Sequence, residues 1–552
     1  MQPDDGDARY ARAFPIAAVV IVIAILAVNG FPHGTDWPYE LTRVAEMREA
    51  FAAGQLPPFW APDDYHGFGS PVFLYYAPLF ATIASLFTLI VPHVPDASIA
   101  ALVLSVIAAA LMMRGAAAEI AGPVGHRVAV IAFVLHPYVL ADIWIRNANA
   151  EVTALALLPG VIAGAVSPRP HRRFWWTFLS LTGCVLAHNL TSLVATAMVV
   201  SIAIFVHRNV RALLPTLAGV AAALAVTSFF WLPAMALQKL AVRSDALIAG
   251  KFDFHNQFPR PTALIVLNPP SEYSSGGYLG AIMVAVVLIA AIAWRGSDSH
   301  ARRVLQACAI AAAVLILLML RVSTPVWERL PLIRYLQFPW RLVGPLAVVT
   351  ILGFAMLLPQ AARAWPRTTR IVEALFLGVA LVNALPIFLI YPRMPRSEMR
   401  RFSALLTPER IRTYGLRTIV GDAYLPVDAD PRVMRAGREP VAFLSPGISI
   451  RVVAAPPGNA HVAVSSANGG SIAFRRWFFP VWDASIDGTP VPIRKMAGGI
   501  AGVAVPPGEH EIRFALAEPV LRTITKAASA MAAAIVAIVV LLRRRRAVSS
   551  QA

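Results

Sequence analysis

The chain has 552 residues, of which 58% are hydrophobic and 14% charged, and its mean hydropathy is +0.64. A soluble protein cannot hide that much apolar surface, so the composition predicts a multi-pass membrane protein. The net charge of +18 does not indicate a nucleic-acid partner, because the arginines cluster in short loops between apolar runs, as in cytoplasmic loops.

About thirteen apolar runs recur along the chain. They are rich in Ala, Leu, Val and Ile without strand alternation, so they predict membrane helices rather than barrel strands. The runs lie near 14–29, 72–91, 97–113, 127–143, 152–166, 174–188, 190–206, 212–235, 277–294, 303–320, 342–358, 370–390 and 521–542. The first run has an acidic leader and no convincing cleavage site, which favours a retained helix over a signal peptide. Cys184 and Cys308 lie inside apolar runs and offer no disulfide or thiolate–metal framework.

Basic loops set the predicted orientation of these helices. They lie at 114–127, 168–173, 207–211, 295–303, 363–370 and 543–546. If run 72–91 is an interfacial or re-entrant helix, a cytoplasmic N-terminus places every basic loop on the cytoplasmic side. Tyr75, Tyr76 and Pro78 at the start of that run suit an interfacial helix. In this model the chain crosses a bacterial inner membrane about twelve times, and both termini lie on the cytoplasmic side. The alternative is an ordinary spanning helix over 72–91 and an outside N-terminus.

The predicted fold is mainly α, a polytopic membrane helix bundle with a small extracytoplasmic β domain near the C-terminus. From about Ile448 the chain alternates apolar and polar residues, broken by PPG, NGG and DGTP turns, which predicts short antiparallel strands. The predicted domains are a helical domain over 1–390 with an outer loop at 30–71, a connection and β-sandwich-like domain over 391–520, and a final helix with a basic cytoplasmic tail over 521–552.

The first candidate site residue lies in the loop that follows the first apolar run. Asp36 stands in GTDWPYELTR, just past the predicted outer end of that helix and before a new helical pattern. A carboxylate at the membrane surface beside a cavity can act as a general base or hold a divalent cation. The alternative is that Asp36 caps the following helix.

The second candidate group is ADIWIRNANAE, which holds Asp142, Arg146 and Glu151 at a predicted outer helix end. An arginine at membrane depth must pair or face a polar cavity, and its guanidinium suits phosphate oxygens. The alternative is a structural ion pair between Arg146 and Glu151 that closes the two helices.

Two further motifs are expected on the same outer face. AHNLTSL carries His188 and Asn189, which could contact a substrate or only cap helix ends. YLQFPWRLVGP carries Gln337 and Arg341, where the arginine could bind phosphate or act as an interfacial anchor. No GxGxxG or P-loop signature occurs in the chain.

These residues resemble motifs of a known family. GTDWPYELTR is similar to the G-H-D-x-x-x-H-x-x-R element of the 6-pyruvoyl-tetrahydropterin-synthase-related membrane proteins, and GQLPPFWAPDDYHGFGSPVFLYYAPL, IRNANAE and QFPWR resemble their other motifs. The segment from WFFPVWDASIDGTPVPI to VPPGEHEIRF resembles the β domain of YfhO-like membrane proteins. Both families are similar to GT-C glycosyltransferases, which use polyprenyl-phosphate-linked sugars on the outer face.

The resemblance implies roles for single residues. Asp36 takes the place of the carboxylate in the first outer loop, Arg146 and Glu151 stand at the second outer loop, and Arg43 matches the arginine of the first motif. The family's two histidines are replaced by Thr35 and Glu40, so cation binding through the second histidine is in question, although Glu40 could supply an oxygen ligand.

The resemblance therefore predicts a membrane glycosyltransferase. Asp36, Arg146 and Glu151 would be catalytic, and the substrate-binding residues would be Glu40, Arg43, Asp142, His188, Asn189, Gln337 and Arg341. Its partners would be a polyprenyl-phosphate sugar in the membrane and a glycan or other envelope acceptor. A divalent cation, Mg or Mn, held by Asp36, Glu40 and Glu151, is an option that the sequence does not require. The alternatives are a transporter or flippase of a lipid-linked or anionic solute, and a non-catalytic envelope scaffold.

Overall fold

The protein is described by a computed structural model that covers residues 5–241, 248–264, 277–294, 298–330, 332–358, 369–390, 394–419, 422–434, 441–455 and 458–549. The chain divides into two compact units that interleave along the sequence. The first unit consists of Met1–Trp37, Ile99–Ala225 and Leu247–Arg396. The second consists of Pro38–Ser98, Val226–Ala246 and Ser397–Ala552. Parts of two predicted basic loops, 295–297 and 363–368, lie outside the described residues.

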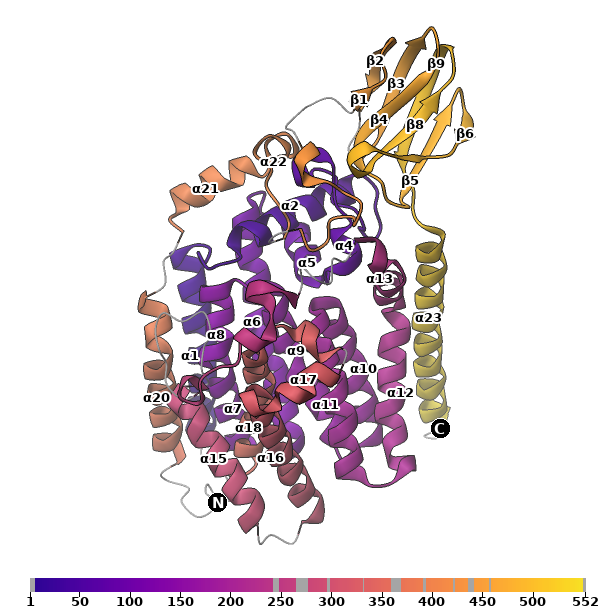
Figure 1. The fold of residues 1–552 in the computed structure, drawn as a ribbon. Coiled ribbons are helices and arrows are strands. Elements are labelled where there is room, and N and C mark those ends of the chain that lie inside the picture. Colours follow the sequence, from indigo (N-terminus) through magenta and orange to yellow (C-terminus); the bar gives the residue numbers. More distant parts are fainter. Residues whose placement is uncertain are drawn as a thin grey trace. The chain divides into compact units, whose positions relative to one another are not determined.

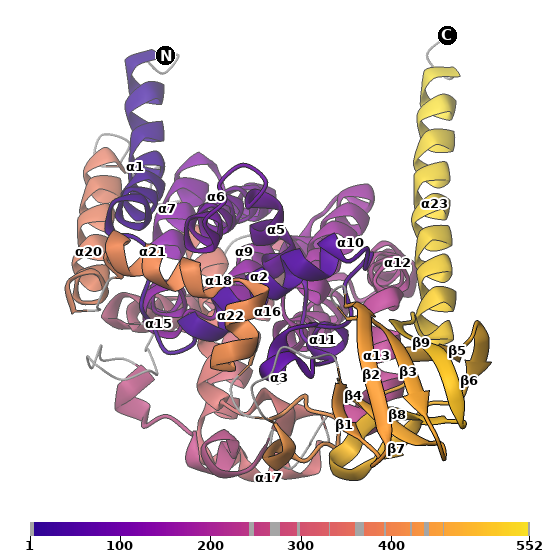
Figure 2. The ribbon, with the colours of Figure 1, turned by 90° about the horizontal axis from the view of Figure 1, so that it is seen from above.

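The described part of the first unit is built of helices (Figure 1). Its longer helices are α1 (Asp5–Asn29), α6 (Val94–Ile120), α7 (Pro123–Val134), α9 (Asn149–Val166), α10 (Pro170–Ala187), α11 (Asn189–His207), α12 (Val210–Val226), α15 (Gly277–Ala293), α16 (Ser299–Met319), α18 (Val343–Ala355) and α20 (Thr369–Ile390). Its shorter turns are α8 (Pro137–Ala141), the π-helical η1 (Asp142–Arg146), η2 (Gly250–Phe252), η3 (Phe254–Asn256), η4 (Pro261–Leu264), η5 (Arg321–Ser323), α17 (Thr324–Arg329), η6 (Ile333–Leu336) and η7 (Pro339–Leu342). Figures 1 and 2 both place α1 beside α20.

Helix α9 is almost entirely buried, and small residues let α10 approach it closely. A Cβ atom added to Gly160 would stand 2.1 Å from the Ser180 Oγ atom, and one added to Gly164 would stand 2.2 Å from the Thr177 Oγ1 atom. Small residues four positions apart are the usual device for close helix packing in membranes. The packing therefore fixes α9, and with it the position of Glu151 in its first turn.

The second unit joins helices to two antiparallel sheets. Its helices and turns are α2 (Trp37–Ala52), α3 (Asp64–Gly67), α4 (Val72–Tyr75), α5 (Leu79–Phe87), α13 (Ser228–Ala241), α21 (Arg396–Leu405), α22 (Pro408–Tyr414), η8 (Pro431–Val433), η9 (Ala497–Gly499) and α23 (Val520–Ser549). Its strands are β1 (Val441–Leu444), β2 (Ile448–Ala454), β3 (Ala460–Ser466), β4 (Gly470–Trp477), β5 (Trp482–Ile486), β6 (Thr489–Val491), β7 (Arg494–Met496), β8 (Ile500–Val505) and β9 (Gly508–Leu516).

The strands form a four-stranded sheet in the order β1-β4-β8-β7 and a five-stranded sheet in the order β2-β3-β9-β5-β6. The second order can be followed in Figure 2. Phe474 of β4 stacks on Phe514 of β9, with ring centroids 4.3 Å apart, so aromatic packing links the two sheets. The predicted C-terminal antiparallel β domain is thus confirmed.

Part of the predicted outer loop packs on these sheets. The Phe68 ring stacks on Trp477, with centroids 4.6 Å apart, and Trp60 meets Trp482 edge-on at 5.0 Å. The backbone agrees, since the Trp477 N–H donates to the Phe68 carbonyl. Most of the outer loop therefore belongs to one compact unit with the β domain, whereas the predicted domains are consecutive stretches of chain.

The structure supports a multi-pass membrane protein. Within the described residues, six helices are long and apolar enough to cross a membrane, or seven if α12 and α13 form one bent span. The six are Val94–Ile120, Pro123–Arg146, Asn149–Val166, Asn189–His207, Ser299–Met319 and Val520–Leu542. Four shorter apolar helices are Ala13–Asn29, Leu279–Ala293, Pro339–Ala355 and Glu373–Leu389. The count of about twelve crossings stays a prediction.

The run 72–91 is not one continuous helix. It holds α4, with 4 residues, and α5, with 9 residues. Nine helical residues rise about 13 Å, far less than the ~30 Å of a hydrocarbon core. A single straight spanning helix at this run is therefore wrong, while its interfacial placement stays a prediction.

Candidate functional site

The start of the predicted outer loop is bonded to the end of η1 through its backbone. The Thr35 N–H donates to the Ile145 carbonyl at 2.9 Å. The Asp36 N–H donates to the Arg146 carbonyl at 3.0 Å. A Cβ atom on Gly34 would stand 2.5 Å from the Ile145 carbonyl oxygen, so only glycine permits this close approach. These two hydrogen bonds, which we call the clasp, place Asp36 next to Arg146 in space although 110 positions separate them.

The π-helical turn η1 supplies the carbonyl groups that accept the two hydrogen bonds of the clasp. It ends at Asn147, whose backbone is left-handed with φ 53°, a conformation that asparagine tolerates better than most residues. The Asn147 side chain donates to the Ile143 carbonyl at 3.1 Å and accepts a hydrogen bond from the Gly34 N–H. The Asn147 amide is therefore bonded to both segments that the clasp joins, the start of the outer loop and η1.

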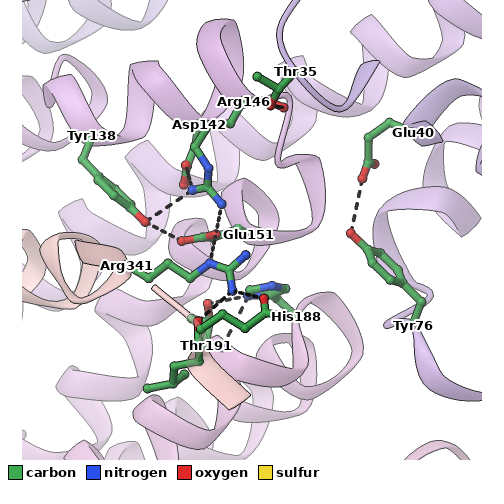
Figure 3. A network of polar contacts seen from close by, with 12 residues as sticks. Thr35, Glu40, Tyr76, Tyr138, Asp142, Arg146, Glu151, His188, Thr191 and Arg341 are labelled. Carbon is green, nitrogen blue, oxygen red and sulfur yellow. Dashed lines mark hydrogen bonds and ion pairs between the residues drawn. The ribbon is translucent and has the colours of Figure 1, made fainter. Parts of the chain in front are cut away.

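Arg146 is the centre of a buried ion network (Figure 3). Its guanidinium pairs with Asp142 one turn earlier and with Glu151 Oε2 at 2.9 Å. The Tyr138 hydroxyl donates to Glu151 Oε1 at 2.6 Å and lies 3.4 Å from the same guanidinium. The ring of Trp340 lies 4.7 Å from the guanidinium carbon. The structural ion pair between Arg146 and Glu151, the alternative to a phosphate-binding arginine, is therefore present.

Arg341 extends the network from η7. Its Nε atom lies 3.6 Å from Glu151 Oε2. Its Nη1 donates to the Leu336 carbonyl at 2.9 Å and to Gln337 Oε1 at 3.2 Å. Two carboxylates, Asp142 and Glu151, thus face two guanidinium groups, and the formal charges of the four cancel. Balance of this kind is what permits ionised groups in an apolar interior.

His188 lies at the edge of the network. Glu151 and Arg341 act electrostatically on its ring, and its Nδ1 atom lies 2.8 Å from the Thr191 hydroxyl. Nδ1 also accepts from the Thr191 N–H, which makes His188 the N-cap of α11. Asn189 begins α11 with an exposed side chain. The structure thus shows the capping alternative for His188, beside the arginine network.

Some buried polar atoms near Arg146 have no hydrogen-bond partner among the described residues. They are Asp142 Oδ2 and both polar side-chain atoms of Asn149. Buried polar atoms are almost always bonded in folded proteins, and each exception costs free energy. A polar ligand that reached these atoms would recover that free energy, so they favour a binding site over a purely structural ion cluster.

Two predicted substrate-binding residues belong to the second unit. Arg43 pairs with Glu40 at 2.6 Å and donates to the Thr418 carbonyl at 2.6 Å. The Tyr76 hydroxyl lies 3.3 Å from Glu40 Oε1, and its ring lies 3.6 Å from the Arg43 guanidinium carbon. Glu40 and Arg43 therefore form a buried ion pair within their own unit, and their substrate-binding role stays a prediction.

Tyr138 is a member of the network that was not predicted from the sequence. A sequence feature could have found it, because a tyrosine inside an apolar run must bring its hydroxyl to a polar partner. Tyr138 opens α8 directly after Pro137, and its N–H is capped by the His136 side chain at 3.2 Å. The cap fixes the start of the helix that aims this hydroxyl at Glu151.

The predicted cation ligands do not form a recognisable site. In the described part of the chain, no three His, Cys, Asp or Glu side chains lie close enough together to hold a metal ion. Glu151 is bonded to Arg146 and Tyr138, and Glu40 to Arg43. Metal dependence therefore stays an untested prediction.

Comparisons with known proteins give only remote structural likenesses. No family model and no curated protein matches the sequence, so the family resemblance stays a prediction. The arabinofuranosyltransferase AftD from Mycobacteria is 19% identical, with a TM-score of 0.43, over 68% of this chain and 26% of its own. An Archaeoglobus fulgidus oligosaccharyltransferase is 14% identical, with a TM-score of 0.34, over 71% and 53%. ArnT from Cupriavidus metallidurans is 16% identical, with a TM-score of 0.29, over 74% and 89%. The chain spans about a quarter of the length of the first of these proteins.

Proposed function

We propose that the protein is a membrane glycosyltransferase that moves a sugar from a polyprenyl-phosphate-linked donor to an envelope or glycan acceptor on the extracytoplasmic face. One observation carries the proposal: the clasp bonds the backbone of Asp36 to the backbone of Arg146, whose side chain is the centre of a buried network with two guanidinium groups. Sugar transfer from a lipid phosphate needs a base for the acceptor and cations for the departing phosphate.

The proposed reaction assigns a separate task to each group. Asp36 accepts the proton of the acceptor hydroxyl, whose oxygen forms a bond to the anomeric carbon of the donor sugar. The bond between that carbon and the phosphate oxygen breaks, and the polyprenyl phosphate leaves with the electron pair. Cationic donors placed where this negative charge develops lower the barrier.

The two arginines differ in the number of carboxylates that each one contacts. Arg146 is held by two carboxylates, while Arg341 touches one of them at 3.6 Å. We therefore assign Arg341 to the phosphate, and Arg146 to holding Glu151 in place. Gln337 accepts from Arg341 Nη1 at 3.2 Å, so it orients that guanidinium. No step uses a metal ion.

The sharpest test replaces Asp36 by asparagine, which keeps the size of the side chain and removes its basicity. In a deletion strain, a plasmid copy of Asp36→Asn should leave the same envelope sugar missing as no plasmid at all, as measured by glycan composition analysis. Asp483→Asn is the matched control, because Asp483 is an exposed carboxylate of β5. Full restoration of the sugar by Asp36→Asn at wild-type protein level would remove the proposal.

A further inference from the structure

A cavity of about 290 Å³ lies within the second unit, between the end of α2, the edge of β9 and the start of α23. Its walls include Gln55, Phe59, Asn459, Leu516, Glu518 and Lys526. The volume is close to the lower end of the range for small-molecule sites. None of these residues belongs to the ion network around Arg146, so the cavity is a separate feature.

The walls of the cavity are held in place by their own hydrogen bonds. Gln55 Oε1 accepts from the N–H groups of Phe59 and Trp60, and its Nε2 donates to the Trp60 carbonyl at 3.0 Å. Asn459 Oδ1 accepts from the Leu516 N–H at 2.7 Å. A cavity built this way needs little ordering when a ligand enters, which favours binding.

Opposite charges meet on one side of the cavity. Lys526 Nζ lies 2.8 and 3.2 Å from the two oxygens of Glu518, and both side chains keep about a third of their surface exposed. Arg522, one turn from Lys526, is instead buried. It donates to the Pro57 carbonyl at 2.9 Å, lies over the Phe59 ring at 4.5 Å, and brings its Nε atom to 3.5 Å from Glu518 Oε1. Arg522 therefore supports the wall, while Glu518 and Lys526 remain accessible.

We propose that this cavity binds a single saccharide unit. A sugar hydroxyl can donate to Glu518 and accept from Lys526 at once, so the ion pair need not break. The Phe59 and Leu516 side chains supply apolar wall for the faces of the sugar ring that carry C–H groups. A phosphate headgroup fits less well, because it would lie against the Glu518 carboxylate and compete with it for Lys526 and Arg522.

The position of the cavity on α23 indicates what kind of glycan would carry the bound saccharide. Lys526 lies in the second turn of α23, and α23 carries the candidate membrane span Val520–Leu542. A saccharide bound there would belong to a glycan close to the membrane surface. That this glycan is the acceptor rests on the proposed function, whereas the binding itself does not.

Binding can be measured without turnover. The purified full-length protein in phosphatidylcholine nanodiscs would be titrated with the methyl glycosides of glucose, galactose, mannose and arabinose by saturation-transfer difference NMR. We expect at least one glycoside to bind, and Glu518→Gln and Lys526→Met each to weaken it at least fivefold. Glu509→Gln is the matched control, because Glu509 is an exposed residue of β9, and it should bind as the wild type does.

Other outcomes would decide against the proposal. No glycoside binding by a protein with a wild-type melting curve would overturn it, as would unchanged binding by both variants. Binding of glycerol 1-phosphate in place of the glycosides would assign the cavity to a phospholipid headgroup instead. Asp36→Asn should bind the glycoside as the wild type does. Failure of the proposed transfer reaction can therefore be told apart from failure of the cavity to bind a saccharide.

Discussion

Three carboxyl groups of the second unit lie buried side by side in a small cluster. Glu46 Oε2 accepts from the Asp63 N–H at 3.0 Å, and Glu46 Oε1 has no partner among the described residues. Asp64 accepts from the hydroxyls of Ser70 and Thr418. Burial, and then the charges of Asp63 and Asp64, raise the pKa of Glu46 well above its ordinary value. Arg412, 3.1 Å from Asp63, opposes the effect of burial at that carboxyl.

This cluster makes stability depend on pH in a definite direction. Since the pKa of Glu46 is raised in the folded state, the folded protein holds this proton more tightly than the unfolded chain does. The free energy of unfolding should therefore fall as the pH rises from the unfolded carboxyl pKa, about 4.3, through the raised folded pKa. Glu46→Gln, which cannot ionise, should raise the melting temperature at pH 8.5 and change it little at pH 5. Differential scanning fluorimetry of the full chain across this range measures the effect.

A matched variant separates this effect from a general change in charge. Glu398 is an exposed residue of α21 in the same unit, so Glu398→Gln should leave the melting profile unchanged at both pH values. If Glu46→Gln lowered the melting temperature at pH 8.5, the carboxylate would be ionised and stabilising at that pH, which contradicts a raised folded-state pKa.

Among the elements, the clasp between Gly34–Asp36 and the end of η1 is sensitive to a single methyl group. A Cβ on Gly34 would press against the Ile145 carbonyl at 2.5 Å, and overpacking of this kind typically costs about 1–3 kcal/mol. Gly34→Ala should therefore displace Asp36 from Arg146 and abolish sugar transfer, with a lower melting temperature. The glycan assay of the complemented deletion strain and a melting curve would measure both effects.

Another helix of the same unit supplies the control for this variant. Gly378 of α20 has no described atom within 4 Å of an added Cβ, so Gly378→Ala should keep transfer and stability at the wild-type level. Normal transfer by Gly34→Ala would show that the clasp does not position the proposed base.

At the level of elements, the predicted helices and strands agree with the structure where the local sequence pattern determines them. Apolar runs fix where helices form, since lipid-facing backbone must be bonded internally, and alternation fixes the strands. The clasp could not be predicted, because it consists of backbone bonds between segments 110 positions apart. The π-helical geometry of η1 was also missed. Tyr138 was missed although its partners Arg146 and Glu151 lie nearby in the sequence, where a tyrosine inside an apolar run requires a polar partner. The Arg146–Glu151 pair was within reach, because an arginine in an apolar stretch requires a partner nearby.

For the whole molecule, the domains predicted from the sequence are consecutive stretches, whereas the two compact units of the structure are each built from three separate stretches. The stretch 38–98 and the strands share one compact unit, and the stacking of Phe68 on Trp477 and the contact of Trp60 with Trp482 show the physical reason. Large aromatic side chains that are exposed in one segment need a second segment to cover them. Sequence patterns reveal that these side chains are apolar but not which distant strand they meet.

The last prediction concerns the sidedness of the whole molecule, on which the proposed function depends. The positive-inside rule places the basic loop 168–173 in the cytoplasm and the β domain outside. His171 and Asp483 are exposed residues of these two regions. Both native cysteines, Cys184 and Cys308, are buried, so they give little background in thiol labelling. In cells whose outer membrane has been made permeable, Asp483→Cys should react with a membrane-impermeant maleimide, and His171→Cys should react only after the inner membrane is disrupted. The reverse pattern would place the β domain in the cytoplasm, where acceptor glycans of the envelope do not reach it, and the proposed transfer reaction would have to be abandoned.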